Sequence, residues 1–275
     1  MSVVLSIDAL VLAKGCRSLT LDLGPGDKLA VVGLSGSGKT QLAETVAGRA
    51  KPFSGEVVRR GAVVEAWHGG HNRRATPLSL AQKAQGGRDD GMCAQVLTAL
   101  GLWDDREAAV ANLPVGMMVA CDLLPCLLAP ADLAVIDGQL DLLDPWTLDR
   151  VLASVEELSG QGRSFVVVTN NLWLAERLGS LVVLRGCEAV YAGSVGDLVR
   201  RGRPSEVTVT TSDPSTAQSM ADPFMLSIQK TADGLHLTAH DGQALAARLL
   251  TEGYGSVKAV VVKEPAFADV LLELM

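Results

Sequence analysis

Apolar runs alternate with amphipathic segments through about the first 200 residues of this chain. Four short apolar runs have the length and composition of buried strands: residues 29–32, 133–136, 165–168 and 181–184. Three segments have helical spacing of their apolar positions: residues 41–47, 148–158 and 172–178. Strands that alternate with helices pair in parallel, and the helices cover both faces of the sheet. This part of the chain is therefore predicted to be an α/β domain.

The pattern changes near residue 204, after a short arginine-rich run. Thr and Val alternate from there, and the expected elements are strands at 206–211, 224–229, 235–239 and 257–262 and helices at 244–250 and 267–274. We predict two domains: an α/β domain at residues 1–203 and a small accessory domain of strands and helices, of the α+β class, at residues 204–275. The second domain has 4 Lys and Arg against 9 Asp and Glu, so it carries most of the excess negative charge.

Composition and charge exclude several classes of protein. The 24 Lys and Arg against 31 Asp and Glu give a net charge of −7, so no nucleic-acid partner is expected. The most hydrophobic region, residues 115–136, is interrupted by Asp and Pro, whereas a membrane helix needs ~20 uninterrupted apolar residues. The five cysteines form no Cys-x-x-Cys pair and the N-terminus has no basic leader. These features predict a protein of the reducing cytoplasm.

One motif carries a specific chemistry. The octapeptide GLSGSGKT at residues 33–40 fits the phosphate-binding pattern Gly-x4-Gly-Lys-Ser/Thr, between a predicted strand and a predicted helix. Glycines let the backbone approach a phosphate closely, the helix N-terminus supplies positive potential, and Lys39 adds a charge. The hydroxyl of Thr40 is placed to bind Mg²⁺. The predicted nucleotide contacts are Ser35, Gly36, Ser37, Gly38, Lys39 and Thr40.

A second strand narrows the class of phosphate-loop protein. The run LAVIDG at 133–138 is an apolar strand that ends in Asp137, the position of the carboxylate that holds Mg²⁺ in such proteins. Asp137 and Thr40 are therefore the predicted metal ligands. The chain has no Asn-Lys-x-Asp string, which disfavours a guanine-specific GTPase.

The order and spacing of four motifs resembles the ATP-binding cassette (ABC) ATPases: LPVGM at 113–117, LAVIDG at 133–138, DLLD at 141–144 and VVVTNN at 166–171. In that family they are the signature, Walker B, D-loop and switch segments. The resemblance implies a P-loop NTPase fold, an ABC nucleotide-binding domain with a mixed sheet and a helical subdomain at roughly 75–130. It implies ATP and Mg²⁺ as ligands, and a sandwich dimer with Gly116 and Asp144 at the contact.

Several family positions are altered. The catalytic Glu that follows the Walker B Asp is replaced by Gly138, and the switch His is replaced by Asn170. The signature Ser is Pro114, Lys14 stands near the place of the ring that stacks on adenine, and no Gln occupies the Q-loop before Leu78. A missing acid–base group costs ~10²–10⁴-fold and a missing charge-stabilising donor ~10²–10³-fold. We expect a chain that binds Mg-ATP and hydrolyses it weakly or not at all, with no catalytic residue intact.

The C-terminal segment indicates which partners the chain has. Glu264-Pro265 followed by Asp269-Val270-Leu271-Leu272 resembles the tail of exporter-type ABC ATPases. The resemblance implies an ATP-binding subunit of an export-type transporter, coupled to a separate membrane subunit, either as a homodimer or as a heterodimer with a second, intact ATPase. It would lie in the cytoplasm, peripheral on the inner face of the membrane through those subunits.

Two other functions stay open. The chain is alternatively a non-hydrolysing pseudo-ATPase that acts as a scaffold or nucleotide sensor in a membrane protein complex, or an active enzyme with Asp141 as its base.

Residues 117–129 are expected to form one apolar helix that Pro125 kinks. His68 and His71 are expected in a surface loop.

Overall fold

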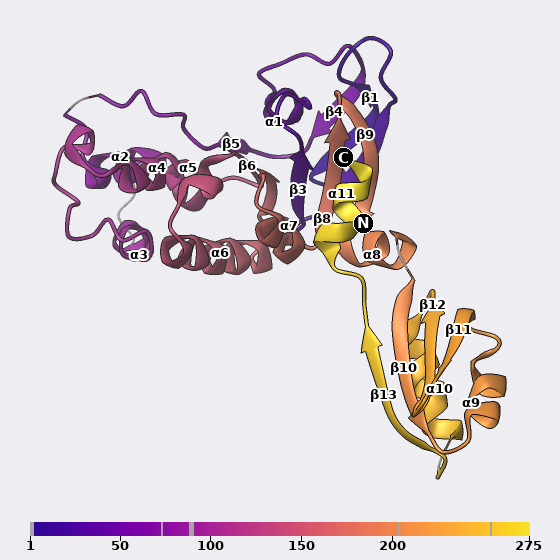
Figure 1. Ribbon diagram of the computed structural model, residues 1–275. Helices are drawn as coiled ribbons and strands as arrows, with labels where there is room; N and C mark the ends of the chain where they lie inside the picture. The colour runs from indigo at the N-terminus through magenta and orange to yellow at the C-terminus, as the bar shows by residue number, and fades with distance from the viewer. Residues whose placement is uncertain (1–2, 73, 88–90, 203, 254) are drawn as a thin grey trace. The chain divides into compact units, whose positions relative to one another are not determined.

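The computed structural model describes residues 3–72, 74–87, 91–202, 204–253 and 255–275, and it separates the chain into two compact units (Figure 1). The first unit comprises residues 1–192 and the second comprises residues 193–275. The helix α8 (Val195–Gly202) belongs to the second unit, whereas the sequence pattern groups it with the first. The two placements of the boundary therefore differ by one short helix.

A six-stranded sheet forms the centre of the first unit, with the strand order β5-β6-β7-β3-β8-β9. The pairs from β5 to β8 are all parallel, as the alternation of strands and helices predicts. The inner strands are buried on both faces, which explains their continuous Val, Ile and Leu composition. The strands are β3 (Lys28–Gly33), β5 (Val63–Glu65), β6 (Leu133–Asp137), β7 (Ser164–Val168), β8 (Ser180–Arg185) and β9 (Glu188–Ser194).

A second, three-stranded sheet packs over the same core, and the sequence reasoning placed no strand there. It is antiparallel, in the order β2-β1-β4, and comprises β1 (Leu5–Val11), β2 (Leu19–Leu23) and β4 (Ser54–Arg59). The register of β1 shifts beside Ala9, which has a φ of +45°. This bulge breaks the alternation of apolar and polar residues by which a half-buried strand is normally recognised in a sequence.

Helices cover the central sheet and form a separate group beside β5 and β6, where α2 to α5 gather (Figure 1). The structure replaces the expected kinked helix at 117–129 by two helices that meet at Leu123. Pro125 has no N–H to donate to the preceding turn, so it begins a new helix instead of bending the old one. The bounds are α1 (Lys39–Ala47), α2 (Pro77–Ala84), α3 (Met92–Ala99), η1 (Val110–Asn112), α4 (Val115–Asp122), α5 (Leu124–Leu128), η2 (Gln139–Leu142), α6 (Pro145–Gly160) and α7 (Leu172–Leu178).

The second unit contains a β-α-β-β-α-β arrangement, the split βαβ motif. Its antiparallel sheet has the order β11-β12-β10-β13, and α9 and α10 contribute to a core of its own. The short helices α8 and α11 pack together in the same unit. The elements are β10 (Ser205–Thr211), α9 (Pro214–Ala221), β11 (Met225–Thr231), β12 (Gly234–Ala239), α10 (Gly242–Glu252), β13 (Val257–Lys263) and α11 (Phe267–Leu274).

Among the residues that the structure describes, no helix combines the length and the apolar character needed to cross a membrane.

Candidate functional site

The phosphate loop connects the end of β3 to the start of α1. Gly36 and Gly38 have φ values of +78° and +94°, a backbone region that side-chain-bearing residues rarely adopt. Gly38 is the N-cap of α1 and makes no side-chain cap, so the first N–H groups of the helix remain directed at the loop. A helix N-terminus of this kind attracts anions.

Lys39 lies across this loop. Its Nζ donates to the carbonyl oxygens of Gly33 at 2.7 Å and Leu34 at 2.9 Å. Only 9% of the residue is exposed, and this burial lowers the pKa of the amine while the carboxylates of Asp137 and Asp141 act in the opposite direction. The lysine is thus held at the loop by backbone oxygens, with two negative charges nearby.

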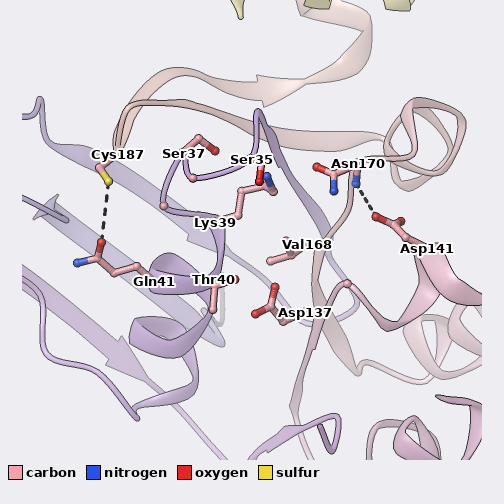
Figure 2. Close-up of a pocket in the computed structure, with 13 residues that line it drawn as sticks. Ser35, Ser37, Lys39, Thr40, Gln41, Asp137, Asp141, Val168, Asn170 and Cys187 are labelled. Carbon is pink, nitrogen blue, oxygen red and sulfur yellow. Dashed lines mark hydrogen bonds between the residues drawn. The ribbon is translucent and has the colours of Figure 1, made fainter. Parts of the chain in front are cut away.

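The phosphate loop and the end of β6 line one pocket, which has a volume of about 460 Å³ (Figure 2). Thr40 and Asp137, the two residues predicted as metal ligands, both line it, and their oxygens suit Mg²⁺. Ser37 also lines the pocket, and its buried Oγ has no hydrogen-bond partner in the described structure. The lining residues are Ser35, Gly36, Ser37, Gly38, Lys39, Thr40, Gln41, Asp137, Gly138, Asp141, Val168, Asn170 and Cys187.

Asp141 joins the turn after β6 to the end of β7. Its carboxylate accepts a hydrogen bond from the Thr169 hydroxyl. It accepts a second one, of 2.7 Å, from the backbone N–H of Asn170, which Figure 2 shows. Thr169 is fully buried, so its hydroxyl needs this acceptor. Asp141 therefore fixes the segment that carries Asn170 against the wall of the pocket.

Gly138 follows Asp137 directly and provides no side-chain acceptor at this position. Its φ is +88°, and a Cβ built on it would meet no atom within 4 Å. The place beside Asp137 is therefore open, and the local backbone is of a kind that disfavours any other residue.

The comparisons with known proteins agree with this geometry. A model of the ABC transporter family matches residues 16–140, from before the phosphate loop to just after Asp137. The chain carries an ABC transporter ATP-binding domain. Among curated proteins, it is similar to the taurine import ATP-binding protein TauB of Roseobacter denitrificans, with 28% identity over 186 residues that cover 61% of this chain and 69% of that protein.

Two further comparisons extend the match. The macrolide export ATP-binding/permease protein MacB of Pectobacterium atrosepticum is 25% identical over 230 residues, which cover 74% of this chain and 34% of that protein. The solved structure of an ATP-binding subunit of an ABC transporter has a TM-score of 0.61 at 20% identity, and covers 72% of this chain and 92% of that one. This last likeness establishes an ABC nucleotide-binding α/β fold. The structure itself adds the C-terminal antiparallel sheet.

Two predicted site residues of the ABC domain lie outside its pocket. Gly116 is in the first turn of α4, and Asp144 is the N-cap of α6, where it accepts from the amides of Trp146 and Thr147 at 3.0 Å each. Their predicted contact across a dimer is a property of two chains and stays a prediction.

Sequence reasoning did not place Gln41, Val168 or Cys187 in the site. Gln41 follows the motif directly, but nothing local distinguishes Cys187.

The segment after β5 contacts Gln139, the residue that follows the pocket residue Gly138. The Nε2 of Gln139 donates to the Trp67 carbonyl oxygen at 3.0 Å and lies 3.3 Å from Nδ1 of His68. The sequence has no Gln at the expected Q-loop position before Leu78. In the structure, the amide that reaches this segment instead comes from the turn after β6.

The expectation of a surface loop is wrong for His71. Its side chain is 11% exposed, and its Nε2 lies 2.5 Å from Oδ1 of Asp122. Burial raises the pKa of Asp122, while hydrogen bonds from His71 and the Gly69 amide act to lower it. A buried carboxylate needs such partners, and their positions 51 and 53 residues earlier in the chain could not be inferred from sequence.

Proposed function

We propose that this chain binds Mg-ATP as the ATP-binding subunit of an ABC export-type transporter and hydrolyses it weakly or not at all. The observation that carries the proposal is a single pocket that brings Lys39, Thr40 and Asp137 together and leaves the position after Asp137 without a carboxylate. The residues fit the ligand, because the loop offers N–H groups, a cation and a buried unpaired hydroxyl to phosphate.

The chemistry expected of this pocket is binding without turnover. Lys39 and the N-terminus of α1 hold phosphate charge, and Thr40 and Asp137 hold the metal ion. Mg²⁺, when bound, neutralises phosphate charge. With Gly138 and Asn170 in place of the acid–base and sensor groups, turnover is expected to be suppressed by at least about a thousandfold.

Asp141 is the one carboxylate of the pocket besides Asp137. Its two oxygens already accept hydrogen bonds from Thr169 and Asn170, which supports a positioning role in preference to that of a general base. An active enzyme that uses Asp141 is therefore the weaker alternative.

The partners and the direction of transport follow from likeness alone. The C-terminal tail supports export, while TauB is by name an import protein and MacB an export protein. We propose a membrane subunit as partner, a homodimer or a heterodimer with an intact ATPase, and a peripheral position at the inner face of the membrane. Recovery of the tagged chain with a polytopic membrane protein would support the transporter; recovery only with other soluble proteins would favour the scaffold.

The first test measures Mg-ATP affinity by calorimetry and phosphate release by the purified chain, beside Lys39→Ala. Wild type is expected to bind with turnover at background, and Lys39→Ala to lose at least about tenfold in affinity, because a charge-assisted contact contributes about 1.5–3 kcal/mol. Gly138→Glu alone is expected to leave turnover low, since Asn170 and Pro114 remain. Turnover of wild type that Asp141→Asn abolishes would reject the proposal in favour of the active enzyme.

A further inference from the structure

One cysteine contacts the turn that carries another cysteine from a distant part of the sequence, beside the phosphate loop. Cys16 is in the loop between β1 and β2, and Cys187 is in the turn between β8 and β9. The Cys16 thiol lies 3.6 Å from the carbonyl oxygen of Gly186, which belongs to the peptide bond that leads into Cys187. The residues that follow each cysteine are joined by an ion pair of 2.9 Å between Arg17 Nε and Glu188 Oε1. These contacts hold the loop that carries Cys16 against the turn that carries Cys187.

Cys187 also forms part of the nucleotide pocket (Figure 2). Its N–H donates to the carbonyl oxygen of Ser37 at 2.9 Å, and its Sγ lies 4.0 Å from Oε1 of Gln41. A Cβ built on Gly38 would come within 3.0 Å of the same sulfur. The thiol therefore touches the phosphate loop, and anything added to it changes the space beside that loop.

An independent observation indicates that this wall takes a polar ligand. Ser37 is 3% exposed and its Oγ has no hydrogen-bond partner in the described structure. Buried hydroxyls are normally satisfied, so this one is available to a group that enters the pocket. Cys187 itself has a backbone conformation that glycine usually adopts. Its φ is +64°, and it is the second residue of a two-residue turn whose first residue, Gly186, has a φ of +58°.

From these contacts we propose that Cys16 and Cys187 form a reversible thiol–disulfide pair, and that exchange at Cys187 and nucleotide binding exclude each other. The second part rests on the proposed function. The oxidant is a small disulfide, RSSR. The Cys187 thiolate attacks one sulfur, forms a Cys187–S–S–R bond and releases RS⁻. The Cys16 thiolate then attacks the Cys187 sulfur and releases the second RS⁻. Two protein thiols lose two electrons and two protons, and RSSR becomes two RSH.

The remaining cysteines provide controls within the same chain. Cys93, Cys121 and Cys126 are buried, whereas Cys16 and Cys187 are partly exposed. Burial raises the pKa of Cys121 to about 12 and raises the pKa of the Cys126 thiol as well. Because the thiolate is the nucleophile, these thiols are expected to stay unmodified under conditions in which the pair reacts.

The first experiment incubates the full chain with glutathione disulfide and maps its disulfides by mass spectrometry of peptides. Wild type is expected to give a peptide pair joined through Cys16 and Cys187, which dithiothreitol separates. Cys16→Ser is expected to stop at glutathione on Cys187, because the second thiol is absent. Cys187→Gly, which suits the turn, controls for folding and forms no such link. Absence of the link in wild type, or a link to another cysteine, would overturn the pair.

The second experiment measures glutathione on Cys187 in Cys16→Ser at equilibrium in a glutathione redox buffer, with and without Mg-ATP. Mg-ATP is expected to lower the modified fraction by about tenfold, and by linkage the modified chain is expected to bind Mg-ATP more weakly by the same factor. In the chain that combines Cys16→Ser with Lys39→Ala, the same Mg-ATP concentration is expected to lower the modified fraction much less. Equal modification of a chain shown by calorimetry to bind Mg-ATP overturns the exclusion. If wild type binds no Mg-ATP, the proposed function fails while the disulfide map still decides the pair.

Discussion

At the scale of single residues, the site depends on backbone conformations as much as on side chains. Gly138 has a φ of +88° beside Asp137, so the position that carries a catalytic Glu in related ATPases has here a conformation that favours glycine. A side chain placed there would start from a strained residue.

Gly138→Ala is expected to destabilise the protein by about 1–2 kcal/mol, because an L-residue pays a steric cost in the left-handed region while the surrounding space is open. Gly116→Ala is the matched control. Gly116 lies in α4 with an ordinary φ and with no atom within 4 Å of an added Cβ, so the same substitution is expected to be neutral or stabilising by up to about 1 kcal/mol. Urea unfolding of both variants would measure the difference; equal effects would contradict it.

At the scale of elements, Asp144 begins α6. Its carboxylate accepts from the amides of Trp146 and Thr147, and hydrogen bonds from the Thr147 side chain and from these amides lower the pKa of Asp144. A carboxyl group whose pKa is lowered by folding stabilises the fold above about pH 4, its unfolded value, and loses this effect as the pH falls through the lowered value.

Asp144→Ala is expected to cost about 1 kcal/mol of unfolding free energy at pH 7, because α6 loses its cap, while Asp144→Ser is expected to cost much less because a serine caps equally well. Thermal unfolding followed by circular dichroism at pH 7 would measure both. Near pH 3 the gap between wild type and Asp144→Ala is expected to narrow, since the carboxylate becomes protonated. A gap that widens there would contradict the assignment.

Asp141 connects two elements, the turn after β6 and the end of β7. Asp141→Asn replaces one acceptor oxygen by an NH₂ group that faces another donor, at Thr169 or Asn170, and is expected to cost about 1–3 kcal/mol. Asp149→Asn is the control, because the Asp149 side chain is 67% exposed and its ion pair with Arg177 lies at the surface, where such pairs contribute about 0–1 kcal/mol. Chemical denaturation would compare the two variants. Equal losses of unfolding free energy would contradict the role of Asp141 in joining the two elements.

At the scale of the whole molecule, the nucleotide pocket lies entirely within residues 35–187, inside the first unit. The second unit has a separate core around β10, β12 and α10. A chain of residues 1–194, which keeps β9 intact, is therefore expected to bind Mg-ATP within about threefold of the full chain, as independent domains do. Calorimetry on both chains would test this. A loss of binding in a folded 1–194 chain would show that the second unit supports the pocket.

The sequence by itself determined the phosphate loop, the strand that ends at Asp137 and the parallel pairing of the central strands, because each depends on residues that are neighbours in the chain or on buried apolar runs. Tertiary structure decided what involves distant segments. The three-stranded sheet was hidden by a bulge at Ala9, and the break between α4 and α5 depended on how Pro125 was accommodated. The pairs Asp141–Thr169, His71–Asp122 and Cys16–Gly186 join residues 28 to 170 positions apart. Such contacts are set by packing, because the chain places no local signal at either member.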